Sequence, residues 1–360
     1  MKIDGDSPLL PVEIVLNSSW WFHREGITFD EDFYFHPAKR VETERHMELA
    51  LYERWGKYGL GGSYQEHKPE VGPVHLAAGY IISGMLGCQI EFPPAASPMV
   101  HCAGREELKI DVEAAFKSPI YRKFASLMDT LKGKYGFLSG DVNWSGVLNA
   151  ALDLRGQALF LDIFDSPERV SAYFNAIARV IERFTDGVLK QTGTTSISVN
   201  RTVRYFDQPV FLHSECSNTM ISAADYERFL LPIDEAWSLT HRPFGVHHCG
   251  ADPHRFAASY AKIPHLDFLD VGWGGDIALL RQYLPDTFLN IRLSPVEINK
   301  QTIAEIRETI RRLVQQSGNV QRTGVCCINM DQDVSDDKIT TILQTVQELR
   351  KELAHNTQSR

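Results

Sequence analysis

Four short apolar runs, separated by segments with helical patterning, constrain the fold of this chain more than any other feature. They lie in the second half of the sequence, at residues 244–247, 268–271, 288–293 and 324–328. Helical patterns fill the intervals and follow the last run, notably at 299–316, ended by Gly318, and at 336–353. Strands that alternate with helices through short connections are typical of a parallel sheet.

The length of 360 residues is compatible with one closed barrel, because α/β barrels reach this size as single domains. The sequence has no glycine-rich phosphate-binding motif, which favours the barrel over an open doubly wound sheet. We therefore predict an α/β fold with a TIM-type (β/α)8 barrel over residues 61–360. The preceding residues 1–60 are rich in aromatic side chains that must cover apolar surface, so we predict an extension that packs on the barrel.

Local signals predict further elements. Residues 37–58 are expected to form a helix. Ser166 and Pro167 are suited to the start of a long helix that reaches Gly193. A strand is expected at 209–213, followed by a helix that begins near Ser222.

Composition and charge restrict the partners. The net charge is −9, with 46 acidic and 37 basic residues, and no long Lys/Arg cluster occurs, which argues against nucleic acid as the main partner. No run of 18 apolar residues could span a membrane. The first six residues are unlike a secretory signal, so we expect a cytoplasmic protein. Six cysteines are too few for a disulfide framework, and Cys88, Cys102 and Cys216 are expected to be small buried apolar residues.

Histidine and cysteine side chains follow two of the predicted strands. His247 and Cys249 are two residues apart, so on an extended strand they point to the same side, and His248 points to the other. Cys326 and Cys327 end a later strand, and alternation alone does not tell which of them faces the same site. Imidazole and thiolate ligands from two strand ends would form a tetrahedral zinc site with one open position. The alternative is a buried structural strand and an unrelated cysteine pair.

Two carboxylates and several polar residues lie close to these strand ends. Asp270 and Glu215 could occupy the fourth metal position or orient a ligand, and the alternative for each is a capping or solvated acid. We take them as the catalytic candidates. The candidates for substrate binding are Asp141, Asn143, His213 and Trp273.

Several segments resemble the uroporphyrinogen decarboxylase superfamily and, within it, the zinc-dependent corrinoid methyltransferases. They are residues 86–93, 161–168, 221–232 and the sequence His-His-Cys-Gly at 247–250, within a similar layout over roughly 72–353. The resemblance implies a TIM barrel and zinc bound by His247 and Cys249. It also implies a third zinc ligand, a cysteine that precedes the last helix. Cys327 fits this position slightly better than Cys326.

The chain departs from this family at three points. Residues 20–26 have no counterpart of the arginine-bearing segment that holds porphyrinogen carboxylates in the decarboxylases. The sequence Cys-Cys-Ile-Asn at 326–329 stands where the methyltransferases usually have Gly-Cys-Gly. The segment 213–216 lacks the acidic pair often found there.

The resemblance implies a zinc-dependent transfer of a methyl group between a corrinoid and a small-molecule acceptor. Methylcobalamin on a partner corrinoid protein would be the donor, and a thiol or a reduced pterin would be the acceptor. One alternative is a metal-free decarboxylase, and another is a non-catalytic corrinoid- or metal-binding module. The aromatic N-terminal segment could also pack across a homodimer.

Overall fold

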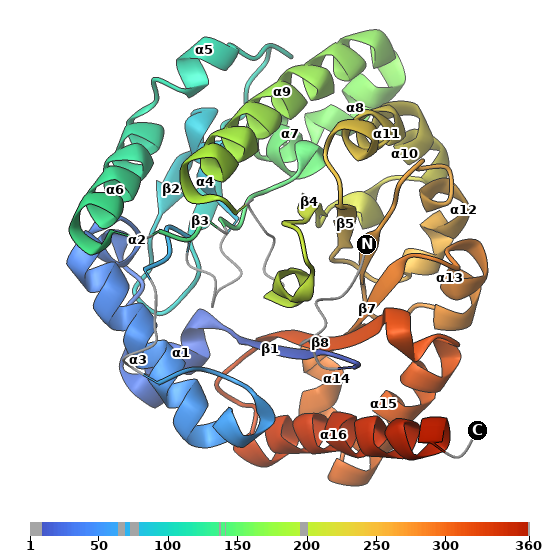
Figure 1. Cartoon of the computed structure of the whole chain (residues 1–360). Coiled ribbons are helices and arrows are strands. Elements are labelled where there is room, and N and C mark those ends of the chain that lie inside the picture. Colours follow the sequence, from blue (N-terminus) through green and yellow to red (C-terminus); the bar gives the residue numbers. More distant parts are fainter. Residues whose placement is uncertain are drawn as a thin grey trace.

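A curved sheet of six parallel strands forms the centre of the molecule (Figure 1). The computed structural model describes residues 9–63, 69–72, 79–136, 138–140, 142–194 and 201–358. The order of strands across the sheet is β1-β8-β7-β6-β5-β4. Their bounds are Val12–Leu16 for β1, Phe211–Glu215 for β4, Phe244–His248 for β5, Phe268–Val271 for β6, Phe288–Leu293 for β7 and Thr323–Met330 for β8.

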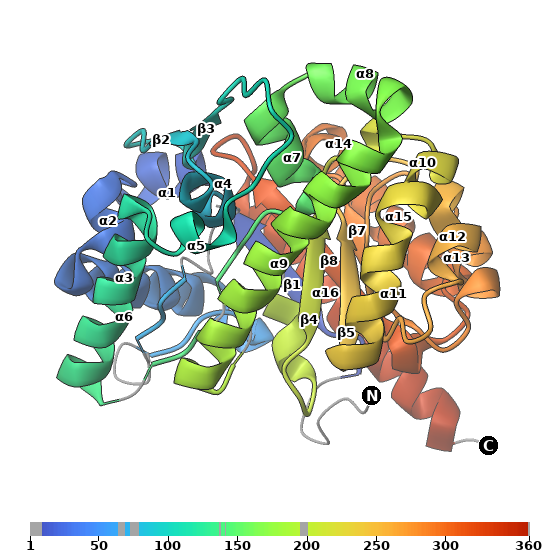
Figure 2. The same cartoon turned by 90° about the horizontal axis from the view of Figure 1, so that it is seen from above.

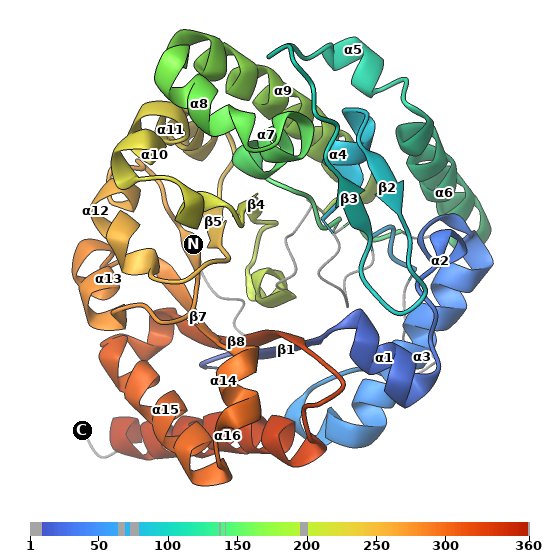
Figure 3. The ribbon, with the colours of Figure 1, turned by 180° about the vertical axis from the view of Figure 1, so that it is seen from behind.

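Helices surround this sheet as an outer ring, which is visible from both ends of the molecule (Figures 1 and 3). They are α1 (Ser18–Glu25), α2 (Glu31–Phe35), α3 (Pro37–Trp55), α4 (Ile81–Met85), α5 (Val112–Ala115), α6 (Pro119–Tyr135), α7 (Val147–Arg155), α8 (Ala158–Asp165), α9 (Pro167–Thr192), α10 (Ala223–Phe229), α11 (Leu231–Thr240), α12 (Ala257–Tyr260), α13 (Ile277–Tyr283), α14 (Pro295–Lys300), α15 (Ile303–Gln316) and α16 (Asp336–Gln358). Short 3-10 helices are η1 (Gly56–Tyr58), η2 (Arg201–Tyr205), η3 (Asn218–Met220), η4 (Pro253–Phe256) and η5 (Val320–Arg322). The turned view shows α9 and α11 in front of the strands (Figure 2).

The strands are buried on both faces, as expected for parallel strands between a barrel interior and a layer of helices. Every residue of β5, β6 and β7 is buried. Alternate side chains of β7 point to opposite faces: Ile291 packs in the large core beside the helices, while Phe288 packs with Phe268 in a smaller cluster. This alternation decides which polar side chains face the interior.

The predicted elements of the second half are largely confirmed. The bounds of β6 and β7 are those predicted, and β8 is longer than the predicted run. The predicted 299–316 helix is in fact two helices. Thr302 forms a capping box with Glu305, and this start signal separates α15 from α14. In the first half, α9 begins at Pro167 and ends at Thr192, and the next residue, Gly193, caps it with a φ of 75° that suits glycine.

The prediction of a (β/α)8 barrel is confirmed only in part. The parallel sheet and its ring of helices are a TIM-like arrangement, but in the described residues this sheet has six strands and not eight. Between β1 and β4 the described chain contributes one isolated parallel bridge, from Glu70 to Ser139. The antiparallel pair β2 (Gln89–Glu91) and β3 (Met99–His101) forms a separate small sheet.

The N-terminal segment does more than cover the sheet. Val12–Leu16 pairs with β8 as strand β1, whereas the sequence predicted only an extension that packs on the barrel. The aromatic residues after β1 are buried in the main core, including Trp20, Trp21 and Phe33. The predicted helix over 37–58 is α3 followed by η1. In the part of the chain that the structure describes, no helix is long and apolar enough to cross a membrane.

Candidate metal centre

Two thiols and one imidazole converge at the ends of two neighbouring strands. Cys216 directly follows β4, His247 lies in β5, and Cys249 directly follows β5. One ligand atom from each lies within 4.8 Å of the others. The register of β4 against β5 explains this arrangement. Ser214 of β4 pairs with His247 of β5, and Cys216 and Cys249 each come two residues after these partners. His247 is buried, Cys249 is partly buried and Cys216 is exposed as a residue, so the cluster lies near the surface on the Cys216 side.

Asp270 of β6 fixes the orientation of His247. Its carboxylate accepts a short hydrogen bond from Nδ1 of His247 and another, of 3.1 Å, from Nδ2 of Asn290. Burial lowers the pKa of His247, but Asp270 and then Cys249 more than offset it and raise the pKa to about 9. With Nδ1 engaged by the carboxylate, Nε2 is the ring nitrogen available to a metal, an arrangement common in metal-binding histidines.

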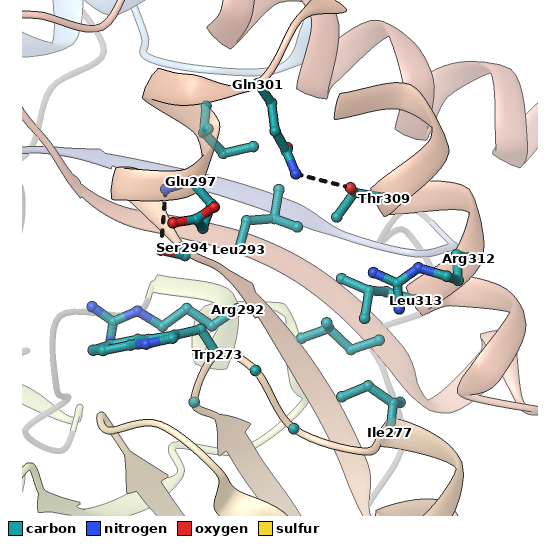
Figure 4. A pocket seen from close by; sticks show the side chains of 15 residues that line it. Trp273, Ile277, Arg292, Leu293, Ser294, Glu297, Gln301, Thr309, Arg312 and Leu313 are labelled. Carbon is teal, nitrogen blue, oxygen red and sulfur yellow. Dashed lines mark hydrogen bonds between the residues drawn. The ribbon is translucent and has the colours of Figure 1, made fainter. Parts of the chain in front are cut away.

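Arg292 of β7 supplies a positive charge to the cluster. Its Nη1 donates to Sγ of Cys249 at 3.0 Å, and its guanidinium lies 5.2 Å from the ring centroid of Trp273 (Figure 4). The pKa of Cys249 is well below its ordinary value, first because Cys216 donates a hydrogen bond to it and then, against the effect of burial, because His247 and Arg292 stabilise the thiolate. The same hydrogen bond raises the pKa of Cys216. The hydrogen bond between them therefore favours the thiol form of Cys216 and the thiolate form of Cys249.

The structure does not bring Cys327 to this cluster. Cys327 points to the helix side of β8, where its thiol donates to the carbonyl of Leu293 at 3.7 Å. Cys326 points to the interior, and its thiol donates to Oδ1 of Asp270 at 3.7 Å. Neither residue belongs to the group of three ligand atoms described above.

Cys216 takes the third position, although the sequence predicted it to be a small buried apolar residue. It is exposed, as is Cys102. The sequence signal for Cys216 was weak, because it lacks a neighbouring histidine at the H-x-C spacing. Only the pairing of β4 with β5 places it beside Cys249.

Glu215 and His213 lie on the opposite side of β4 from Cys216. His213 contacts Asp234 of α11 through Nδ1 at 2.6 Å and Glu215 through Nε2 at 3.0 Å. Glu215 also accepts from the backbone N–H of Leu148, in the first turn of α7, at 2.8 Å. Burial lowers the pKa of His213, but Asp234 and Glu215 more than compensate and raise it to about 10. His213 and Glu215 therefore connect the end of β4 to α7 and α11 through hydrogen bonds, and they do not face the cluster of Cys216, His247 and Cys249.

The other candidates are dispersed. Asp141 lies outside the described residues. Asn143 is buried just before α7. Trp273 lies against Arg292 and is thereby connected to the cluster. His248 points away, as predicted, and its Nδ1 lies 2.8 Å from the hydroxyl of Tyr260.

Comparison with known proteins identifies the fold. No family model and no curated protein matches the sequence. Among solved structures, a methyltransferase from Methanosarcina mazei superposes with a TM-score of 0.69 at 11% identity, covering 95% of each chain. A B12-independent methionine synthase from Shewanella sp. W3-18-1, in complex with selenomethionine, superposes with a TM-score of 0.53 at 8% identity, covering 98% of this chain and 100% of the other. The chain shares the fold of these two proteins. The fold that the sequence resemblance implied is therefore also the fold of a known methyltransferase.

Proposed function

We propose that the protein is a zinc-dependent methyltransferase with a thiol as methyl acceptor, and that Cys216, His247 and Cys249 bind the zinc. The observation that carries this proposal is the convergence of two thiols and an imidazole at the ends of β4 and β5, near the surface on the Cys216 side. Sulfur and nitrogen ligands of this kind suit zinc, and three protein ligands leave a fourth position for a substrate. The fold shared with a methyltransferase supports the same reaction class.

The residues around the cluster fit a bound zinc ion. The ion would stabilise the thiolate form of a substrate thiol near neutral pH. Asp270 holds the imidazole of His247 in one orientation and tautomer. Arg292 places a positive charge beside the Cys249 sulfur, which offsets part of the negative charge of two cysteinates. Its stacking on Trp273 keeps the guanidinium in place.

In the reaction, the acceptor thiol loses its proton, its sulfur forms a bond to the methyl carbon, and the bond from that carbon to the donor breaks. The sequence resemblance favours methylcobalamin, carried by a corrinoid protein, as the donor. A methylated reduced pterin is the other donor to compare, since one protein of this fold is described as B12-independent. After losing the methyl cation equivalent, methylcobalamin would leave as cob(I)alamin. A methylated reduced pterin would leave as the neutral N–H pterin, so its ring nitrogen must take up a proton, which the acceptor thiol releases.

The metal content of single variants tests the assignment of the ligands. We expect about one zinc per chain in the parent protein, as for a mononuclear catalytic site. Cys216→Ala, His247→Ala and Cys249→Ala should each lose most of it. Cys326→Ala and Cys327→Ala are the matched controls and should retain it. Retention in Cys216→Ala together with loss in Cys327→Ala would instead support the ligand set implied by the sequence resemblance.

The activity is tested separately on zinc-loaded protein. Thiol acceptors are incubated with methylcobalamin or with a methylated reduced pterin, and the methyl thioether is measured by mass spectrometry. Product that depends on zinc and is lost in Cys249→Ala supports the proposal. A zinc-loaded protein that forms no thioether from either donor would contradict it, and a parent protein without zinc would favour the metal-free decarboxylase alternative.

A further inference from the structure

A cavity lies outside the sheet, between β7, α14 and α15 (Figure 4). Its volume is about 270 Å³. Apolar side chains from the strand and the surrounding helices form much of its lining: Ile277, Ile291, Leu293, Ile298 and Leu313. Polar side chains lie around them, namely Ser294, Glu297, Gln301, Thr309 and Arg312. An apolar cavity with a few convergent polar groups is the usual form of a small-molecule site, and this volume suits a ligand smaller than most drugs.

Gln301 presents an unused acceptor. Its Nε2 donates to Oγ1 of Thr309 at 3.2 Å, which fixes the side-chain amide (Figure 4). Its Oε1 is buried and has no hydrogen-bond partner. A buried carbonyl oxygen without a donor is costly, so this atom favours a ligand that brings an N–H group.

Arg312 presents an unused positive charge. Its guanidinium makes no ion pair and no hydrogen bond with any residue that the structure describes, unlike its neighbour Arg311, which pairs with Glu348 and Glu352. Arg312 lines the cavity beside Leu313. A guanidinium binds a carboxylate through two parallel hydrogen bonds, so this group favours an anionic end on the ligand.

We propose that this cavity binds a free α-amino acid with an apolar side chain. The carboxylate would pair with Arg312, the ammonium group would donate to Oε1 of Gln301, and the side chain would lie on the apolar lining. Glu297 also lines the cavity, and its carboxylate lies 3.3 Å from Nζ of the exposed Lys300. A simple fatty acid would leave the Gln301 oxygen unpaired, and a simple amine would leave Arg312 unpaired.

The cavity also borders the candidate metal centre. Trp273 and Arg292 both line it, and Arg292 donates to the sulfur of Cys249. A ligand in the cavity would therefore lie beside Arg292, whose guanidinium donates to the Cys249 sulfur, and beside Trp273, which stacks on that guanidinium. We expect its binding to change the fluorescence of Trp273, and Trp273→Phe to remove that change.

Calorimetric titration of the full chain with L-leucine tests the proposal. Isocaproate lacks the amino group and isoamylamine lacks the carboxylate, so each should bind at least about tenfold more weakly, as expected when a charge-assisted hydrogen bond is lost. Arg312→Gln and Gln301→Leu should each weaken leucine binding by a similar factor. Lys190→Gln is the control, since Lys190 is an exposed cation in the last turn of α9, away from the cavity, and an effect on leucine binding equal to that of Arg312→Gln would count against the proposal.

The outcome of the leucine titration does not depend on the proposed catalytic function. Leucine binding should persist in Cys216→Ala, which removes a zinc ligand and leaves the cavity unchanged. Absence of binding in the parent protein, equal effects of Arg312→Gln and Lys190→Gln, or isocaproate binding as tightly as leucine would each overturn the proposal. None of these outcomes bears on zinc content.

Discussion

At the scale of single residues, close backbone contacts determine where the cluster lies. A Cβ on Gly272, just after β6, would collide with the carbonyl oxygen of Gly250, the residue that follows Cys249. It would also lie 3.0 Å from the ring of His248. The absence of a side chain at Gly272 lets the ends of β5 and β6 approach one another, and this approach sets the position of the Cys249 sulfur.

Gly272→Ala should therefore weaken zinc binding by about 10- to 100-fold, as changes in the groups that support metal ligands commonly do. Titration with a competing chelator measures the affinity. The matched control is Gly187→Ala in α9, where an added Cβ meets no atom within 4 Å. That variant should bind zinc normally and gain about 0.5–1 kcal/mol of stability from the higher helix propensity of alanine. Equal zinc affinity in the two variants would contradict this account.

At the scale of elements, a buried carboxyl joins two helices behind the β2–β3 hairpin. Asp153 of α7 accepts a hydrogen bond of 2.6 Å from the hydroxyl of Ser83 in α4. Burial raises the pKa of Asp153 to about 6, although the Ser83 hydrogen bond lowers it in part. The ionised carboxylate is thus less favourable in the folded protein than in the unfolded chain.

Because this pKa is raised on folding, the group contributes its stability below the unfolded pKa of about 3.9 and loses it as the pH rises through about 6. Asp153→Asn keeps an acceptor for Ser83 and removes the charge. It should raise the free energy of unfolding at pH 7.5 by about 2 kcal/mol, and most of this gain should disappear at pH 4.5. Urea unfolding at the two pH values measures the difference. A gain that is the same at both would show that charge is not the cause.

At the scale of the whole molecule, segments from near the two ends of the sequence lie side by side. β1 pairs with β8, and α16 packs against α15 and β1. Arg350 of α16 donates to the backbone carbonyls of Leu9 and Leu10, and Trp55 of α3 donates to Thr340 of α16 at 3.1 Å. The last helix therefore connects the N-terminal segment to the C-terminal half of the sheet.

Loss of packing beneath α16 should destabilise the entire chain. Ile342 is fully buried, and Ile342→Ala should lower the free energy of unfolding by about 2–5 kcal/mol because it leaves a cavity in the core. Glu352 lies on α16, like Ile342, and forms an exposed ion pair with Arg311 of α15. Glu352→Ala removes this pair and should change the free energy of unfolding by less than about 1 kcal/mol. Denaturant unfolding followed by circular dichroism and by tryptophan fluorescence should show the same shift for Ile342→Ala. A shift in one signal alone would mean that α16 unfolds separately.

The sequence by itself determined the elements whose signals are local. Apolar runs predicted β6 and β7 to the residue, and Ser166, Pro167 and Gly193 predicted where α9 begins and ends. The spacing of His247 and Cys249 predicted that both face one side, since strand alternation depends only on neighbouring residues. The sequence resemblance also indicated the class of fold that the comparisons identify.

Only the tertiary structure decided which residue joins His247 and Cys249. The choice depends on which strands are neighbours and in what register, and these are contacts between segments far apart in the chain. β4 lies next to β5 and brings Cys216 to the cluster, whereas Cys327 lies three strands from β5 and faces the helices. Pairing with β8 likewise made the N-terminal segment a strand of the sheet. Such contacts are set by the packing of the whole core, and no local pattern of residues encodes them.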